Sequence, residues 1–164
     1  MELLYRVDEA DNVLGSIERE EAHKNDVLHR SVVIFLLRGD GDVLVQWRSA
    51  EKKNFPSCYE CSASGHVTFG ETYEQAAKRE LQEETGVSAR VEYLGKYTHD
   101  HPPEHEMIAV FCARSDAAIK LDRSETESAK FYAPGKLDEI ISSGRAAPWF
   151  EGAWGIARDR LQRK

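Results

Sequence analysis

The segment from Thr72 to Gly86 carries the clearest folding signal in the chain. Thr72 is followed three residues later by Gln75, which is the spacing of a capping box, and Gly86 supplies a C-terminal stop. Between these ends lies an apolar stripe formed by Tyr73, Ala76, Ala77 and Leu81. Such a stripe predicts a helix that packs one face against a core.

The same helix carries three glutamates, Glu80, Glu83 and Glu84, within about one turn. Like charges at this spacing cost roughly 0.2–0.5 kcal/mol per pair. One interpretation is a solvated helix face, which explains most charge runs. However, the helix is otherwise well capped, and the glycine-bearing loop "GHVTFGE" precedes it. Because converging carboxylates are what Mg²⁺ or Mn²⁺ requires, the pattern favours a metal site.

The remaining elements predict a mixed α+β domain. Asp40-Gly41 is a strong hairpin turn between two apolar segments, and the turn-rich "DEADN" predicts a small N-terminal hairpin. The expected strands are residues 3–7, 13–17, 31–37, 43–47, 61–64, 90–98, 107–114 and 128–133, and further helices are expected near 136–143 and 149–162. This order predicts a sheet with helices packed against it.

Composition narrows the class of protein. The 164 residues suit one domain spanning 1–164, and the formal net charge of −7 argues against nucleic acid as a partner. No run approaches the ~18 apolar residues of a membrane helix, and the acidic start "MELLYRVDEAD" lacks the pattern of a signal peptide. We therefore expect a cytoplasmic protein that does not bind membranes.

The chain contains three cysteines, Cys58, Cys61 and Cys112. The first two form a C-x-x-C, which could hold zinc or carry out redox chemistry. There is no second C-x-x-C, and the third cysteine lies in the apolar run "MIAVFCA". We therefore interpret them as buried or incidental thiols in a reducing compartment.

Residues 65–87, "GHVTFGETYEQAAKRELQEETGV", resemble a complete Nudix box. The matching positions are Gly65, Glu71, Arg79, Glu80, Leu81, Glu83, Glu84, Gly86 and Val87. The resemblance implies an α/β/α sandwich with a mixed central sheet, in which the box forms a loop-helix-loop. It also implies hydrolysis of a diphosphate linked to another moiety, with Mg²⁺ or Mn²⁺ as cofactor.

The resemblance also implies roles for individual box residues. Glu80 and Glu84 would be metal ligands, and Glu83 would be a further ligand or the group that activates water. Arg79 would hold the carboxylates in place, and the carbonyl of Gly65 would add a ligand. These roles agree with the chemistry, because a metal lowers the pKa of bound water and a carboxylate can take the proton.

Outside the box, the chain is similar to isopentenyl-diphosphate isomerases and their related hydrolases. The resemblance rests on "LHRSVVIFLL", "QWRSAEKKNFPSCYE", "SGH", "EHE" and "APWFEGAW". It implies a second metal site at the positions that match the isomerase ligands, namely His23, His29, His66, Glu104 and Glu106. The alternative is that these histidines lie at the surface and that "HDHPPEHE" is a solvated loop.

Four further positions match isomerase residues near the substrate. Arg48 and Lys52 match positions that grip the diphosphate, and the alternative is a solvated loop. Trp149 and Trp154 match a C-terminal helix that helps to close the pocket in the isomerases. Core packing is the alternative for both tryptophans. The expected substrate-binding set is therefore Arg48, Lys52 and Trp154.

Ser64 separates two enzyme classes. In the isomerases a cysteine stands just before the box glycine as the acid/base, and a serine hydroxyl is too weak an acid to protonate an alkene. Because the hydrolytic box is also complete, the sequence favours a hydrolase acting on a small-molecule diphosphate. The alternatives are an isomerase and a non-catalytic ligand sensor. We expect a monomer or homodimer, and the moiety on the diphosphate is not readable from the sequence.

Overall fold

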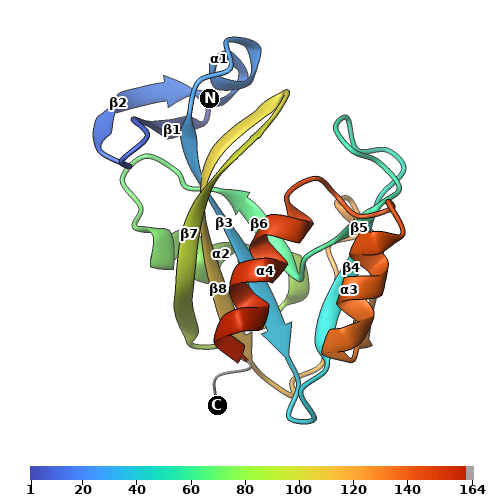
Figure 1. The fold of residues 1–164 in the computed structure, drawn as a ribbon. Coiled ribbons are helices and arrows are strands. Elements are labelled where there is room, and N and C mark those ends of the chain that lie inside the picture. Colours follow the sequence, from blue (N-terminus) through green and yellow to red (C-terminus); the bar gives the residue numbers. More distant parts are fainter. Residues whose placement is uncertain (162–164) are drawn as a thin grey trace.

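The computed structural model describes residues 1–161, which form a mixed sheet with helices on both faces (Figure 1). The strands are β1 (Leu3–Val7), β2 (Val13–Glu18), β3 (His29–Leu37), β4 (Val43–Arg48), β5 (Tyr59–Glu60), β6 (Ala63–His66), β7 (Val91–His101), β8 (Glu104–Arg114) and β9 (Thr126–Tyr132). The helices are α1 (Arg19–Lys24), α2 (Tyr73–Thr85), α3 (Pro134–Ser142) and α4 (Phe150–Leu161).

Strand β3 lies at the centre of the molecule. It pairs in parallel with β8 and antiparallel with β1, β4 and β6, so the sheet is mixed as expected. Successive side chains of a strand point to opposite faces of the sheet. Val32, Ile34 and Leu36 pack on the side of α2, whereas Val33 and Phe35 pack on the side of α3 and α4. The predicted α/β/α sandwich is therefore confirmed, and it explains why β3 is apolar almost throughout.

Helix α2 begins and ends where its sequence signals predict. The Gln75 N–H donates to the Thr72 hydroxyl at 3.1 Å, and the Thr72 N–H donates to the Gln75 side chain at 2.9 Å. Gly86 adopts the left-handed conformation that closes the C-terminus, with φ of 74°. Ala76, Ala77 and Leu81 are fully buried against β3. The helix is thus fixed at both ends and along one face.

Other elements differ from the sequence prediction. Strands β7 and β8 extend to His101 and from Glu104, so the interpretation of "HDHPPEHE" as a solvated loop is wrong. The polar residues of this segment lie on the two paired strands of a hairpin, and the end of this hairpin projects from the sheet (Figure 1). The short elements α1 and β5 were not predicted, since six and two residues carry little periodic signal.

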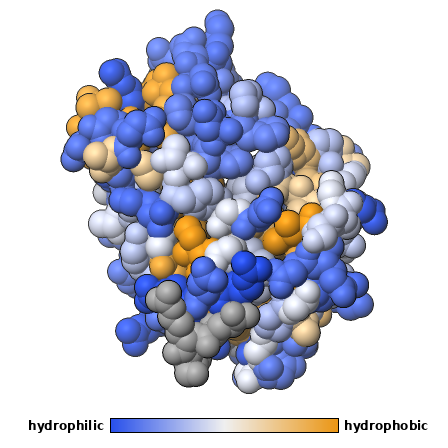
Figure 2. All heavy atoms as spheres, in the orientation of Figure 1, coloured by the Kyte–Doolittle hydropathy of each residue, from blue (hydrophilic) through white to orange (hydrophobic). Residues whose placement is uncertain are grey.

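The C-terminal helices are close to the predicted segments. Helix α3 begins at Pro134, earlier than predicted, because proline is well suited to the first helical position. Helix α4 matches the predicted segment 149–162 through Leu161, and residue 162 lies outside the described residues. None of the helices within residues 1–161 combines the length and apolar character that crossing a membrane requires. The face drawn in Figure 2 is mostly hydrophilic, with apolar residues in small separate patches.

Candidate active-site cleft and metal centres

A cleft of about 850 Å³ lies where β3 and β8 begin and β6 ends. Its walls come from the N-terminal region, α2, the turn of the β7–β8 hairpin and the loop that follows β4. The box residues Gly65, Arg79, Glu80, Glu83 and Glu84 all line this cleft. The fold therefore brings the predicted box residues together in one hollow.

The three box glutamates differ in their surroundings. Glu84 is buried, and one of its oxygens accepts a hydrogen bond from the Ser64 N–H at 2.7 Å. Glu80 is partly buried and accepts from Arg79 at 2.7 Å. The Glu83 side chain is 52% exposed and lies 3.4 Å from Arg79. Two carboxylates are thus held at the wall of the cleft, while the third remains in contact with solvent.

Arg79 ties the box loop to the helix. Its guanidinium donates to Glu71 at 2.8 and 2.9 Å and to the carbonyl of His66 at 3.0 Å. Glu71 in turn accepts from the Thr68 N–H at 2.8 Å. The same guanidinium also donates to Glu80, so one side chain positions both the loop and a box carboxylate.

Gly65 lies against the Glu80 carboxylate. A Cβ atom at position 65 would stand 2.2 Å from the carboxyl carbon of Glu80 and 2.2–2.7 Å from its two oxygens. Any side chain at this position would therefore displace the carboxylate. The backbone φ of Gly65 is not in the left-handed region, so its conformation alone does not call for glycine. The close approach of the Glu80 carboxylate does.

The electrostatics of Glu80 and Glu84 suit a cation. Burial raises the pKa of Glu80 to about 7, although Arg79 opposes this, and Glu83 adds repulsion. Burial, together with repulsion from Glu60 and Glu80, raises the pKa of Glu84 well above its usual value. Neighbouring buried carboxylates therefore destabilise one another's charge here. A divalent cation would relieve that cost, so these residues fit a Mg²⁺ or Mn²⁺ site.

Three histidines meet beside this group. His23 from α1, His29 from β3 and His66 from β6 have ring centroids 5.1 Å apart in every pair. Glu104 approaches His23 at 3.7 Å, and Glu106 approaches His66 at 3.4 Å and His29 at 3.8 Å. Potential ligand atoms of the three histidines and Glu104 all lie within 4.8 Å of one another. The five residues that match the isomerase ligands thus gather at one point.

The histidine rings present free nitrogens at this point. The Nδ1 of His29 is hydrogen-bonded to the Val27 carbonyl at 2.7 Å, which directs the lone pair of Nε2 toward the cluster. The Nε2 atoms of His29 and His23 are buried and have no hydrogen-bond partner within the described residues. Burial lowers the pKa of both His29 and His66 to about 4, so the rings are neutral near pH 7. Neutral imidazoles with an orphaned nitrogen fit a metal site.

The expected substrate-binding residues have different positions. Arg48 and Lys52 line the cleft, but each is paired with a carboxylate, Arg48 with Glu60 and Lys52 with Glu125. The structure does not bring Trp154 to the cleft. Its ring is 1% exposed and lies in the core, where α4 covers the sheet and Phe35 is 5.3 Å away. The core alternative therefore describes this residue.

The candidate site includes two residues outside the expected substrate-binding set, Trp149 in the wall of the cleft and Glu60 behind it. Trp149 lines the cleft and directly precedes α4, whereas the expected substrate-binding set names Trp154. Glu60 is buried behind the cleft and accepts a hydrogen bond from the Trp149 indole at 3.0 Å. A single glutamate on the two-residue strand β5 has no sequence pattern that could have identified it. Only the tertiary contacts do so.

Cys58, Cys61 and Cys112 form no disulfide within residues 1–161. Cys61 is fully buried in the core, and Cys58 is half-buried with its thiol toward the Phe55 carbonyl. Burial raises the pKa of both thiols above the usual value. Within residues 1–161, no cysteine belongs to a group of three or more metal-ligating side chains. These findings agree with buried, unreactive thiols.

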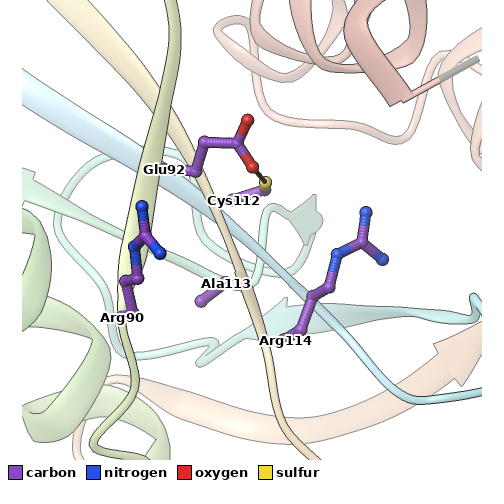
Figure 3. A pocket seen from close by; sticks show the side chains of 5 residues that line it. All are labelled: Arg90, Glu92, Cys112, Ala113 and Arg114. Atoms are coloured by element: carbon purple, nitrogen blue, oxygen red, sulfur yellow. Dashed lines mark hydrogen bonds between the residues drawn. The ribbon is translucent and has the colours of Figure 1, made fainter. Parts of the chain in front are cut away.

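A smaller hollow of about 360 Å³ lies at the opposite end of the β7–β8 pair (Figure 3). It is lined by Arg90, Glu92, Cys112, Ala113 and Arg114. The Cys112 thiol donates a hydrogen bond to a Glu92 carboxylate oxygen, with 3.8 Å between sulfur and oxygen. The box glutamates and the histidine cluster belong to the larger cleft, so we place the functional site there.

Comparisons with known proteins also support the resemblance to Nudix proteins. The NUDIX domain family profile matches residues 27–151. The Nudix hydrolase PA4841 of Pseudomonas aeruginosa is 37% identical over 149 residues, covering 90% of this chain and 86% of the relative. An isopentenyl-diphosphate Delta-isomerase of Serratia proteamaculans is 31% identical over 126 residues, covering 71% and 70% of the two chains.

A solved structure shares the architecture. The crystal structure of DR0079 from Deinococcus radiodurans superposes with a TM-score of 0.75 and 29% identity, covering 89% of this chain and 92% of the other. The family profile spans most of the chain and includes the whole box, from Gly65 to Val87. On these grounds the chain belongs to the Nudix family.

Proposed function

We propose that the protein hydrolyses a small-molecule diphosphate linked to another moiety and that it requires a divalent cation. The observation that carries the proposal is the placement of Glu80 and Glu84. Both line one wall of the cleft, and their charge is destabilised by burial and mutual repulsion. A helix that merely faced solvent would leave these carboxylates exposed and hydrated.

Two groups of residues would hold metal. Glu80, Glu84, the carbonyl of Gly65 and, as a further ligand, Glu83 would form the box site. The second site would be formed by His23, His29, His66, Glu104 and Glu106. A divalent ion bound at the box would neutralise diphosphate charge and make a nearby water more acidic.

The protein's own residues would complete the reaction. Glu83 lines the cleft and its side chain is 52% exposed, which supports a role as the base that accepts a proton from the attacking water. Arg79 holds the box loop and Glu80 in position. Lys52 and Arg48 supply positive charge on the wall facing the box. Because the reaction releases phosphate or a nucleotide-like product, hydrolysis can be followed without knowing the moiety in advance.

The runner-up function is isoprenoid isomerisation, because several relatives are isopentenyl-diphosphate isomerases. Ser64 argues against it. Its hydroxyl donates to the buried Glu60, and a hydroxyl is too weak an acid to protonate an alkene carbon. We expect no interconversion of isopentenyl and dimethylallyl diphosphate. Interconversion at an enzyme-like rate would replace the hydrolase proposal with the isomerase.

A panel of diphosphates tests the proposal. Purified protein is incubated with nucleoside diphosphate conjugates, sugar diphosphates and isoprenoid diphosphates, each with Mg²⁺, Mn²⁺ or a chelator. We expect product release from at least one compound, dependent on metal. Saturable binding of such a compound without turnover under any condition would instead support the ligand sensor.

A further inference from the structure

Glu60 is an unusual residue for its position, because it is a carboxylate that is 2% exposed. Burying an ionised carboxylate is costly unless hydrogen bonds and opposite charge surround it. Here Arg48 donates to one oxygen at 2.6 Å, and Trp149 donates to the other at 3.0 Å. The Ser64 hydroxyl donates to that second oxygen as well. Three side chains from separate segments thus converge on one buried group.

Arg48 uses all three of its guanidinium nitrogens within the protein. Besides the bond to Glu60, its Nε donates to the Phe55 carbonyl and an Nη donates to the Asn54 carbonyl, both at 2.8 Å. The guanidinium also lies over the Trp149 ring, 5.2 Å from its centroid. The Arg48 guanidinium therefore uses its hydrogen-bonding nitrogens on other parts of the protein, which argues against a role in binding a ligand directly.

The segment that Arg48 holds is the loop between β4 and β5, residues 49–58, here called the cleft loop. Phe55 and Ser57 each have a backbone φ of 51°, a left-handed conformation that residues other than glycine rarely adopt. Strained conformations of this kind persist only when their surroundings fix them. The two carbonyls bound by Arg48 belong to Phe55, the first of the strained residues, and to Asn54, which precedes it. The centroids of the Phe55 and Trp149 rings are 5.6 Å apart.

The cleft loop forms one wall of the active-site cleft. Lys52, Lys53 and Asn54 line the cleft from this loop. On the other side of Glu60, the Ser64 N–H donates to Glu84, one of the proposed metal ligands. Glu60 therefore contacts both the groups that support the loop and the strand residue that positions the box carboxylate.

We propose that Glu60 is a positioning residue: through Arg48 and Trp149 it holds the cleft loop in the shape that receives the diphosphate beside the box glutamates. The proposal deepens the proposed function and rests on it for the identity of the substrate. It assigns Arg48 a different role from direct gripping of the diphosphate. The cations left to meet the substrate from this loop are Lys52, whose partner Glu125 is partly exposed, and Lys53.

The variant Arg48→Lys separates the two roles of the arginine. Lysine keeps a positive charge for Glu60 but lacks the planar fork that reaches two carbonyls at once. We expect amide hydrogen exchange in residues 49–58 to accelerate about tenfold or more, because the loop loses its support. For the diphosphate turned over by the wild type, KM should rise about tenfold while kcat changes less than about threefold. Glu51→Gln, at an exposed position in the same loop, should change neither quantity.

The variant Glu60→Gln tests the other end of the network. It should accelerate exchange of the same loop amides, and the double variant Glu60→Gln/Arg48→Lys should be no worse than the more affected single variant. Such non-additivity is expected when two residues act as one unit. If Glu60→Gln does not fold, Arg48→Lys alone decides.

Two results would overturn the proposal. Unchanged loop exchange in Arg48→Lys would show that the network does not support the loop. A fall in kcat with KM unchanged would show that the arginine acts in the chemical step instead. Hydrogen exchange requires no substrate, so it still decides the positioning role if the wild type turns over no diphosphate and the proposed function fails.

Discussion

Single residues of the box are positioned by contacts that exist before any ligand arrives. Arg79 bonds simultaneously to Glu71, Glu80 and the His66 carbonyl, and Gly65 leaves room for the Glu80 carboxylate. Catalytic groups held in this way lose little freedom when the reaction begins. The cost is the burial of charged carboxylates, increased by repulsion from neighbouring glutamates, and it raises the pKa of Glu80 and Glu84.

Replacing Gly65 with alanine should damage the box site specifically. The new Cβ would collide with the Glu80 carboxylate, so the carboxylate must move away from the cleft. We expect Mn²⁺ affinity, measured by calorimetry, to fall about 10- to 100-fold. Gly135→Ala is the matched control, because a Cβ there meets no neighbour within 4 Å. Equal affinity in the two variants would mean that this contact does not matter for the metal.

The histidine cluster makes a separate prediction about metal stoichiometry. Wild-type protein should bind metal at two sites, and His29→Gln should lose one of them while the box site remains. The reason is that Nε2 of His29 is an orphaned buried nitrogen that faces His23 and His66. Elemental analysis after equilibration with Mn²⁺ or Zn²⁺ measures the ratio, and His101→Gln, outside the cluster, serves as control. The same stoichiometry in both variants would argue against the second site.

At the scale of elements, the site is assembled from segments far apart in the chain. Helix α2 supplies the box glutamates, and the residues of the histidine cluster come from α1, β6 and the starts of β3 and β8. Asp11, in the loop between β1 and β2, fastens the N-terminal region to this arrangement. It accepts from Arg30 at 2.8 Å, Lys96 at 2.7 Å and Tyr73 at 2.9 Å.

The Asp11 contacts predict a pH-dependent loss of stability. Burial opposes ionisation, but hydrogen bonds from Lys96, Arg30 and Tyr73 outweigh it and hold the pKa of Asp11 below its usual value. A lowered folded-state pKa stabilises the protein above the unfolded pKa, and the benefit is lost as pH falls through the folded value. Asp11→Asn should therefore lower the free energy of unfolding by about 1–3 kcal/mol at pH 7.

The difference between wild type and Asp11→Asn should stay nearly constant from pH 7 to about pH 5 and shrink as the pH falls below 3.8, the ordinary pKa of an aspartate. Urea unfolding at several pH values measures it, and Asp159→Asn on an exposed part of α4 is the control. A difference that begins to shrink well above pH 5, or that stays constant down to about pH 2, would contradict the assigned ionisation of Asp11.

At the scale of the whole molecule, the sandwich brings the box glutamates and the histidine cluster to one end of the sheet. The apolar length of β3 is covered on both faces and fills the core. At its polar start, His29 is buried beside the cleft and Ser31 lines it. The β7–β8 hairpin extends past the sheet and carries Glu104 and Glu106 over the same cleft. The two proposed metal sites thus share one opening.

Sequence reasoning succeeded where signals were local. Helix α2 and its caps follow from residues within four positions of one another, and the apolar run at 31–37 predicted the strand β3. It failed where the answer depended on packing between distant segments. Nothing in the chain near Glu60 indicates that Arg48, Ser64 and Trp149 converge on it, and the two tryptophans 149 and 154 look equivalent in sequence although only the first lines the cleft.

We propose that Glu84 holds the metal, and the kinetics of Glu84→Gln test this assignment most directly. The substitution keeps the side chain's shape and removes its charge, while Glu74→Gln changes an exposed glutamate of the same helix and serves as control. Since a catalytic metal contributes several kcal/mol, kcat/KM at saturating Mg²⁺ should fall about 100-fold or more for Glu84→Gln and stay near the wild-type value for Glu74→Gln. Near-wild-type turnover by Glu84→Gln would contradict the account.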